Sequence, residues 1–213
     1  MPLLSRIAGC IIVTLLLALG HVSGQGRNYG RSQVITQQGI AATSQTLASQ
    51  AAVQILARGG TAVDAAIAAN AVLAVVEPMK NGLGGDMFAI YYDSKTGKLQ
   101  GLNASGPAPR ALSPEFLAKQ GVTSMPQQGI HSVTVPGAVD GWAKMHTRYG
   151  KLPWKDLFQS AIAYAENGFP VPEAIQESWA DLANRPRVKA NAESMRVFFA
   201  SGKPPQELSL IHI

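Results

Sequence analysis

Few side chains in this sequence could serve as a nucleophile or carry a proton in catalysis. The one cysteine is Cys10, and the histidines beyond the first thirty residues are His131, His146 and His212. No serine lies in a Gly-x-Ser-x-Gly elbow, and no two histidines have the spacing of a zinc site. The sequence therefore predicts neither a Ser-His-Asp triad nor a metal site. His146 lies on a predicted amphipathic helix, where a surface position is expected.

A glycine cluster at Gly82–Gly85 is the next candidate, since such clusters often cradle phosphate groups. A nucleotide-binding loop needs a strand before the cluster and a helix after it, and here the order is reversed. A tight turn that lets two backbones approach is the better interpretation. Asp64 and Asp86 are interpreted as a helix cap and a turn residue. No cofactor is expected.

The composition is that of a globular protein, with 46% hydrophobic and 15% charged residues. The formal net charge is +5, and the basic residues are spread along the chain without forming a block. A stripe of lysine and arginine interleaved with aromatic residues is typical of nucleic-acid binding. Because no such stripe occurs, no nucleic-acid partner is expected.

Residues 1–24 have the pattern of a secretory signal peptide. Ile7–Leu19 is apolar apart from short interruptions, and Val22-Ser23-Gly24 offers small residues for cleavage. The apolar run is short for a bilayer span, and an uncleaved anchor is the alternative. Residues 25–38 are polar and predict a flexible leader. Because Cys10 falls within the signal, the exported chain would hold no disulfide, and a periplasmic or secreted location is expected.

Two adjoining helices rich in small residues are predicted, and they must position the segments that follow them. Thr46 is the expected cap of a helix that ends at Gly59, since the apolar residues between them recur at helical spacing. Thr61 and Asp64 predict a capping box for a second helix that runs to Val76. This second helix is almost wholly apolar, so we expect it to be buried on every side.

Strands are expected at four places. Gly39–Ser44 is short and apolar and predicts a buried first strand, and Ser132–Val135 predicts a later one. Met87–Asp93 and Lys98–Asn103, separated by a turn, predict a β-hairpin. Further helices are predicted at 114–120, 138–149, 154–167 and 172–183, with weaker helical character from there to residue 199.

Several stretches resemble motifs of one enzyme family in order along the chain. They are Gly59–Ala66 (GGTAVDAA), Leu83–Phe88 (LGGDMF), Val135–Trp142 (VPGAVDGW) followed by Tyr149-Gly150, and Glu166–Val171 (ENGFPV). Together they resemble the large subunit of gamma-glutamyltranspeptidases, over a span from about Gly39 to Pro205. Residues 39–205 are accordingly expected to form a truncated transpeptidase-like domain, and residues 206–213 an atypical tail.

This resemblance implies a mixed α/β (α+β) chain, the incomplete large-subunit part of the four-layer αββα sandwich of N-terminal-nucleophile hydrolases. It implies a precursor that cuts itself, so that a new N-terminal threonine on the small subunit attacks a gamma-glutamyl amide. Such a threonine can use its own α-amine as the general base. The expected partner is therefore the small subunit of the same precursor, and no catalytic residue is expected in this chain, which alone should be inactive.

The family's large subunit normally supplies an arginine that holds the substrate α-carboxylate. The best register places Ala104 at that position, and the segment Asn103, Ala104 and Ser105 is expected to line the substrate pocket. Some relatives carry an arginine nearer Pro107, which is also missing, and Arg110 matches an ordinary basic position. Loss of a bidentate carboxylate clamp is expected to weaken gamma-glutamyl recognition.

Two alternatives remain open at this point. The first is an acylase of another amide, as in relatives that cleave β-lactam side chains. The second is a non-catalytic exported binding or scaffold domain. The formal glycosylation triplet Asn103-Ala104-Ser105 is interpreted as structural.

Overall fold

The computed structural model describes residues 34–127, 129–199, 202–207 and 209–211. The predicted signal peptide, Cys10, most of the predicted leader and His212 lie outside the described residues. The chain divides into two units, Met1–Gln37 and Gln38–Ile213, and all of the described helices and strands belong to the second. Within the described part of the chain, no helix is both long and apolar enough to cross a membrane.

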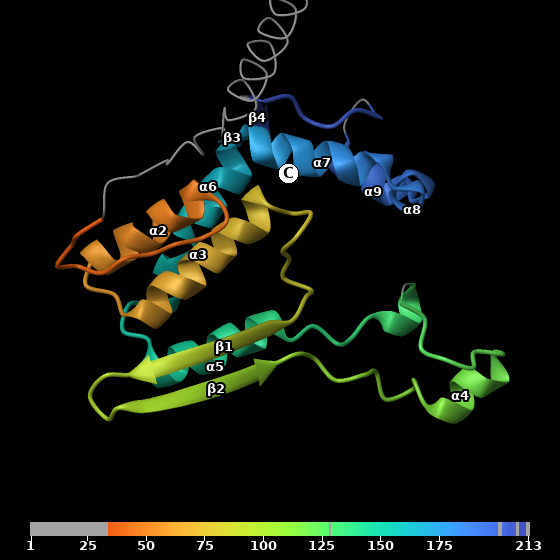
Figure 1. Ribbon diagram of the computed structural model, residues 1–213, viewed down its shortest axis with the longest axis horizontal. Helices are drawn as coiled ribbons and strands as arrows, with labels where there is room; N and C mark the ends of the chain where they lie inside the picture. Colours follow the sequence, from red (N-terminus) through yellow and green to blue (C-terminus); the bar gives the residue numbers. More distant parts are fainter. Residues whose placement is uncertain (1–33, 128, 200–201, 208, 212–213) are drawn as a thin grey trace, which may run out of the picture. The chain divides into compact units, whose positions relative to one another are not determined.

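Helices α2 (Thr46–Ala57) and α3 (Ala62–Val76) pack side by side against each other (Figure 1). Their contact is built largely from alanine, so the two backbones can lie close together. The predicted end at Gly59 is confirmed, because Gly59 follows the last turn with a φ of +82°. The predicted cap at Thr46 is wrong by one residue. Gln45 is the cap, and its side-chain oxygen accepts the Leu47 amide.

The capping box of α3 is present as predicted. The Thr61 hydroxyl accepts the Asp64 amide, and the Asp64 carboxylate accepts the Thr61 amide at 2.8 Å. Most of α3 is buried, with Val72 and Val76 completely so. Further helical segments pack around α3, as Figure 1 shows for α5 and α6. They are η2 (Trp154–Phe158), α5 (Ala138–Tyr149) and α6 (Gln159–Asn167).

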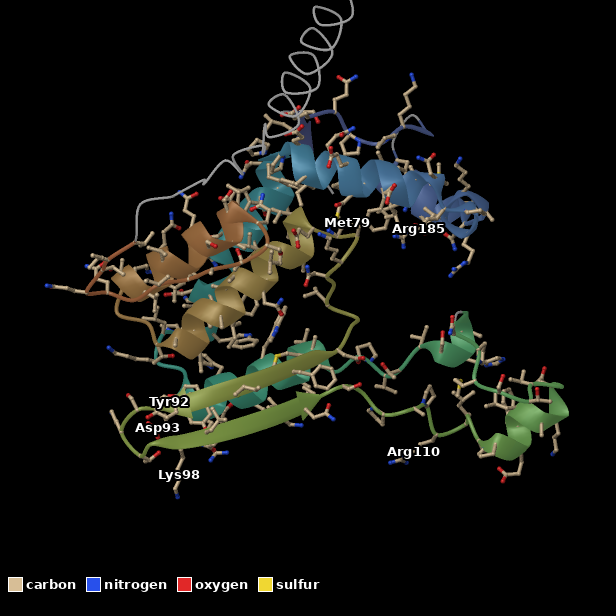
Figure 2. The ribbon with its side chains drawn as sticks, viewed as in Figure 1. Met79, Tyr92, Asp93, Lys98, Arg110 and Arg185 are labelled. Atoms are coloured by element: carbon tan, nitrogen blue, oxygen red, sulfur yellow. The ribbon has the colours of Figure 1, made fainter. Side chains whose placement is uncertain are left out.

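Strands β1 (Met87–Asp93) and β2 (Lys98–Ala104) form the predicted antiparallel hairpin. The register pairs Met87 with Ala104 at the open end and Asp93 with Lys98 at the turn. Tyr92, Asp93 and Lys98 mark this turn in Figure 2. The Asp93 carboxylate accepts hydrogen bonds from the Thr96 hydroxyl and the Lys95 amide. These bonds, the Thr96 bond most strongly, hold the pKa of Asp93 below its ordinary value.

Helix α5 covers one face of the hairpin. Tyr91 of β1 stacks on Tyr149 of α5 with ring centroids 4.2 Å apart, and the Tyr149 hydroxyl donates to Gln100 of β2 at 2.8 Å. Phe88, Ile90 and Tyr92 alternate with the covered residues, so they share the opposite face and are exposed by 61% to 80%. One face of this hairpin is thus apolar and uncovered within the described chain.

Two predicted strands do not form. Gly39–Ser44 is irregular and pairs with no strand among the described residues. Its Thr43 is hydrogen-bonded instead to Ser49 and Gln45 at the start of α2. Ile130–Ser132 forms a short 3₁₀ helix (η1), and the residues after it are irregular. Val135 donates a single bond to Pro107, which is too little for a ladder.

The remaining elements agree broadly with the predicted helices, although the segment 154–167 begins as the 3₁₀ helix η2 before continuing as α6. The segment after Arg185 is more helical than expected. A two-stranded pairing of Phe169–Pro170 (β3) with Leu210–Ile211 (β4) involves part of the predicted tail. The other helices are α4 (Pro114–Lys119), α7 (Glu173–Asn184), α8 (Pro186–Ala190) and α9 (Ala192–Phe198).

Candidate functional site

Three segments that are distant in sequence meet at the open end of the hairpin. We call this place the three-loop junction; it comprises Gly82–Asp86, Ala104–Pro107 and Thr134–Ala138. The Gly85 carbonyl accepts the amides of Gly137 and Ala138, at 3.2 and 3.0 Å. The junction therefore joins the turn before β1, the segment after β2 and the start of α5 through backbone hydrogen bonds.

The backbones at the junction approach so closely that only glycine fits. A Cβ atom on Gly106 would lie 1.4 Å from the Val135 carbonyl oxygen, and one on Gly137 would lie 2.2 Å from the Ala104 carbonyl oxygen. Gly82 and Gly84 have open space around them instead. Gly82–Gly85 does form the predicted turn, with the Gly85 amide bonded to the Gly82 carbonyl, but the close approach occurs at Gly106 and Gly137.

Asp86 connects the other two segments of the junction. Its Oδ1 atom accepts the Gly106 amide at 3.3 Å and the Thr134 hydroxyl at 3.2 Å. Asp86 was predicted to be a turn residue, but it lies between the turn and β1, and its carboxylate contacts residues 20 and 48 positions away. Sequence spacing alone carries no signal for these long-range contacts.

The residues expected to line a substrate pocket lie at this junction but do not share one face. Ala104 is 8% exposed, and its methyl group faces α5 at Gly141, with Met87 beside it. Asn103 is exposed, and its Oδ1 atom accepts the amide of the half-buried Ser105 at 2.9 Å. Asn103 and Ser105 therefore keep access to solvent, whereas Ala104 does not, and none of the three lines either cavity described below.

An arginine at position 104 should fit poorly. A Cβ on Gly141 would already lie 2.6 Å from the Ala104 methyl, so Ala104→Arg must force α5 away from the hairpin. We expect it to lower the free energy of unfolding by about 2–3 kcal/mol, as overpacking commonly does. Ser105→Arg should cost less than about 1 kcal/mol, since its side chain has solvent access. Urea denaturation of both variants measures this, and equal losses would contradict the burial of position 104.

Two cavities adjoin the junction, and Asp86 lines both. The larger is an apolar groove of about 700 Å³ between the segment Gly39–Thr43, helices α2 and α3, and strand β1. The smaller, of about 120 Å³, is more polar and lies beside Asn70, Lys80 and Asn81. Trp142 separates them as a shared wall, with its indole N–H donating to Asn70 at 2.9 Å.

The histidine predicted to lie at the surface is half-buried instead. His146 packs edge-on against Trp154, and its Nε2 atom is 2.9 Å from the Leu152 carbonyl and 3.7 Å from Asp64. Asp64 is completely buried and also accepts the Lys151 and Leu152 amides, at 3.0 and 3.3 Å. This arrangement fastens the loop after α5 to the start of α3. Among the described residues no cluster could hold a metal ion.

Comparison with known proteins supplies the family. The family model described as gamma-glutamyltranspeptidase matches residues 48–213. A glutathione hydrolase-like YwrD proenzyme of Bacillus subtilis is 43% identical over 126 residues, covering 59% of this chain and 24% of the relative. Glutathione hydrolase 5 proenzyme of Rattus norvegicus is 34% identical over 195 residues, covering 91% of this chain and 33% of the relative. The chain thus spans a quarter to a third of these curated relatives.

Solved structures agree with this assignment. Gamma-glutamyltranspeptidase of Helicobacter pylori superposes with a TM-score of 0.75 at 32% identity, covering 85% of this chain and 52% of that one. Cephalosporin acylase of Bacillus halodurans superposes with a TM-score of 0.73 at 36% identity, covering 86% and 36%. The expected α+β fold class of N-terminal-nucleophile hydrolases is confirmed by these neighbours. The chain belongs to the gamma-glutamyltranspeptidase family.

Proposed function

We propose that this chain is the large-subunit part of an exported enzyme that cleaves gamma-glutamyl amides. The observation that carries the proposal is the three-loop junction, where the family motifs Leu83–Phe88 and Val135–Trp142 meet the segment that directly follows Asn103. The names of the matched relatives as proenzymes support a precursor that is cut into two subunits. Export rests on the signal-peptide pattern of residues 1–24.

In this proposal the reacting group lies outside the 213 residues. A threonine at the new N-terminus of the small subunit attacks the amide carbonyl, and its own α-amine takes the hydroxyl proton. Backbone donors then stabilise the tetrahedral oxyanion. The intermediate collapses by breaking the amide C–N bond, and the leaving amine takes the proton from the α-ammonium group. The acyl group, now an ester of the threonine, then passes to water or to an amine acceptor. This chain contributes the wall Asn103–Ser105, which positions the substrate beside that threonine.

The open surfaces of the chain support a partner of this kind. The exposed face of the hairpin is apolar, and the groove beside β1 has apolar walls. Strand β1 pairs only with β2 in the described chain, so its other edge has free hydrogen-bonding groups. We propose that strands of the small subunit enter the groove and cover the hairpin, with Gly39–Thr43 becoming a strand once it has a partner.

Charge on the exposed hairpin face should block this assembly. Phe88→Lys and Ile90→Lys each replace a side chain that is at least 70% exposed, so the free energy of unfolding of the chain should change by less than about 0.5 kcal/mol. Burial of one apolar side chain contributes about 1.5–3 kcal/mol to the free energy of association. Its loss should therefore weaken association with the small subunit at least tenfold. Titration of the two separately produced subunits measures the affinity.

Val53→Lys is the control for this experiment, because Val53 is 44% exposed on α2, away from the hairpin. It should leave the affinity unchanged. Affinities for the hairpin variants equal to that of the parent chain would show that this face is not the contact surface.

A second candidate function is the cleavage of another amide. The 36%-identical cephalosporin acylase favours it, and so does the absence of arginine from Asn103–Ser105, where a carboxylate clamp was expected. The two candidates differ in whether the acyl part of the substrate carries an α-amino acid head group. The guanidinium of an arginine would hold the carboxylate of this head group through two parallel hydrogen bonds. Neither Asn103 nor Ser105 can do this.

A substrate panel on the precursor that contains this chain together with its small subunit tests both candidates. Gamma-glutamyl-p-nitroanilide turnover at least tenfold above that of an acyl-side-chain amide supports gamma-glutamyl cleavage, and the reverse ratio supports the acylase. A processed precursor that cleaves neither class would favour a non-catalytic exported domain and contradict the proposal.

A further inference from the structure

The carboxylate of Asp86 links two loops that otherwise belong to different parts of the chain. Its Oδ1 atom accepts both the Gly106 amide, directly after the wall segment Asn103–Ser105, and the Thr134 hydroxyl, just before α5. We call this set of three residues the Asp86 clasp. We propose that Asp86 is a positioning residue that fixes the wall segment for substrate binding. The inference rests on the proposed function.

The clasp lies at the two ends of a long excursion of the chain. Between Pro107 and Val135 the chain makes a long excursion, and its two ends are joined by one backbone hydrogen bond, from the Val135 amide to the Pro107 carbonyl at 3.0 Å. Asp86 adds a side-chain connection to each end of this excursion. Both donors, the Gly106 amide and the Thr134 hydroxyl, use the same oxygen of Asp86. Loss of one donor therefore leaves the other hydrogen bond in place.

Position also favours a role in ligand binding. Asp86 lines the apolar groove and the smaller polar cavity, so the clasp links the segment that ends at Gly106 to a residue that borders both spaces. Asn103 is tied to the preceding peptide, because its Oδ1 atom accepts the Ser105 amide. Release of Gly106 from Asp86 should therefore displace Ser105 and, through that hydrogen bond, Asn103.

Three variants separate the clasp from general stability. Asp86→Ala removes the acceptor, Asp86→Asn keeps a carbonyl oxygen in the same place, and Thr134→Val removes only the hydroxyl. Asp140→Ala is the matched control. Asp140 is an exposed acid on α5 whose carboxylate pairs with Lys144.

The hydrogen-exchange rate of the Gly106 amide in this chain tests directly whether that amide is bonded to Asp86. Asp86→Ala should speed exchange at least fivefold, whereas Asp86→Asn and Asp140→Ala should leave it within twofold of the parent. Thr134→Val should have a smaller effect, and none when added to Asp86→Ala, because both act through one oxygen. An unchanged Gly106 rate in Asp86→Ala would overturn the clasp.

Steady-state kinetics of the complete processed enzyme test the positioning role of Asp86. Asp86→Ala should raise KM at least fivefold for the preferred amide with kcat within twofold, and Asp86→Asn should restore KM. Faster Gly106 exchange with an unchanged KM would overturn the positioning role. An enzyme that cleaves no amide would contradict the proposed function instead, and the exchange rates would still decide the clasp.

Discussion

Replacement of Gly106 by alanine should unfold the three-loop junction. The new Cβ would lie 1.4 Å from the Val135 carbonyl oxygen and 2.6 Å from its carbon, and these are backbone atoms that cannot rotate away. Either the end of β2 or the segment before α5 must move, which breaks the Val135–Pro107 and Asp86–Gly106 hydrogen bonds. We expect the free energy of unfolding to fall by at least about 3 kcal/mol.

Gly101→Ala is a close control for this prediction. Gly101 lies in β2, five residues before Gly106 and three pairs from the open end, and an added Cβ meets nothing within 4 Å. Alanine there should leave stability unchanged or raise it by about 0.5 kcal/mol, because glycine is unfavourable inside a strand. Thermal or urea denaturation of the two variants measures the difference. Equal stability of the two would contradict the close approach of Gly106 to Val135.

Removal of the buried carboxylate of Asp64 should be comparably damaging. Asp64 is completely buried and accepts backbone amides from Thr61, Lys151 and Leu152. Asp64→Ala leaves these donors without a partner and frees His146, 3.7 Å away, from its neighbouring charge. A buried donor that loses its acceptor costs about 1–3 kcal/mol, so the total loss should be at least about 3 kcal/mol.

Asp64→Asn should be intermediate, at about 1–2 kcal/mol, because one oxygen acceptor remains while the charge is lost. Asp140→Ala, at an exposed acid on α5, should cost less than about 0.5 kcal/mol. Urea denaturation at neutral pH compares the three variants. A loss for Asp64→Ala no larger than that for Asp140→Ala would show that Asp64 does not hold the loop after α5.

The elements that depend on residues close together in the sequence were predicted correctly. The capping box at Thr61 and Asp64 depends on residues three apart, and the hairpin depends on two strand-like runs and a short turn. Gly39–Ser44 has the composition of a strand but needs a partner strand, and none is present among the described residues. The predicted burial is also wrong, since Ile40 is 63% exposed, and composition could not supply the missing hydrogen-bonding edge.

The sequence suggested a candidate segment without its surroundings. The resemblance pointed to Asn103–Ser105 as a pocket wall, and the motifs gave no sign that this segment lies close to the glycine turn and the start of α5. They could not indicate that Ala104 faces α5, because that depends on the close contact with Gly141, 37 positions later. The same limit applies to His146. Helical periodicity predicted a surface position, whereas the loop after α5 folds back and partly buries the ring.

The central claim is that this chain supplies the substrate wall while the reacting threonine belongs to a separate subunit. The most direct measurement is amide hydrolysis by the purified 213-residue chain, alone and after addition of the separately produced small subunit. The account predicts no turnover by the chain alone and turnover when both are present. Amide cleavage by the chain alone, at a rate that the small subunit does not raise, would contradict it.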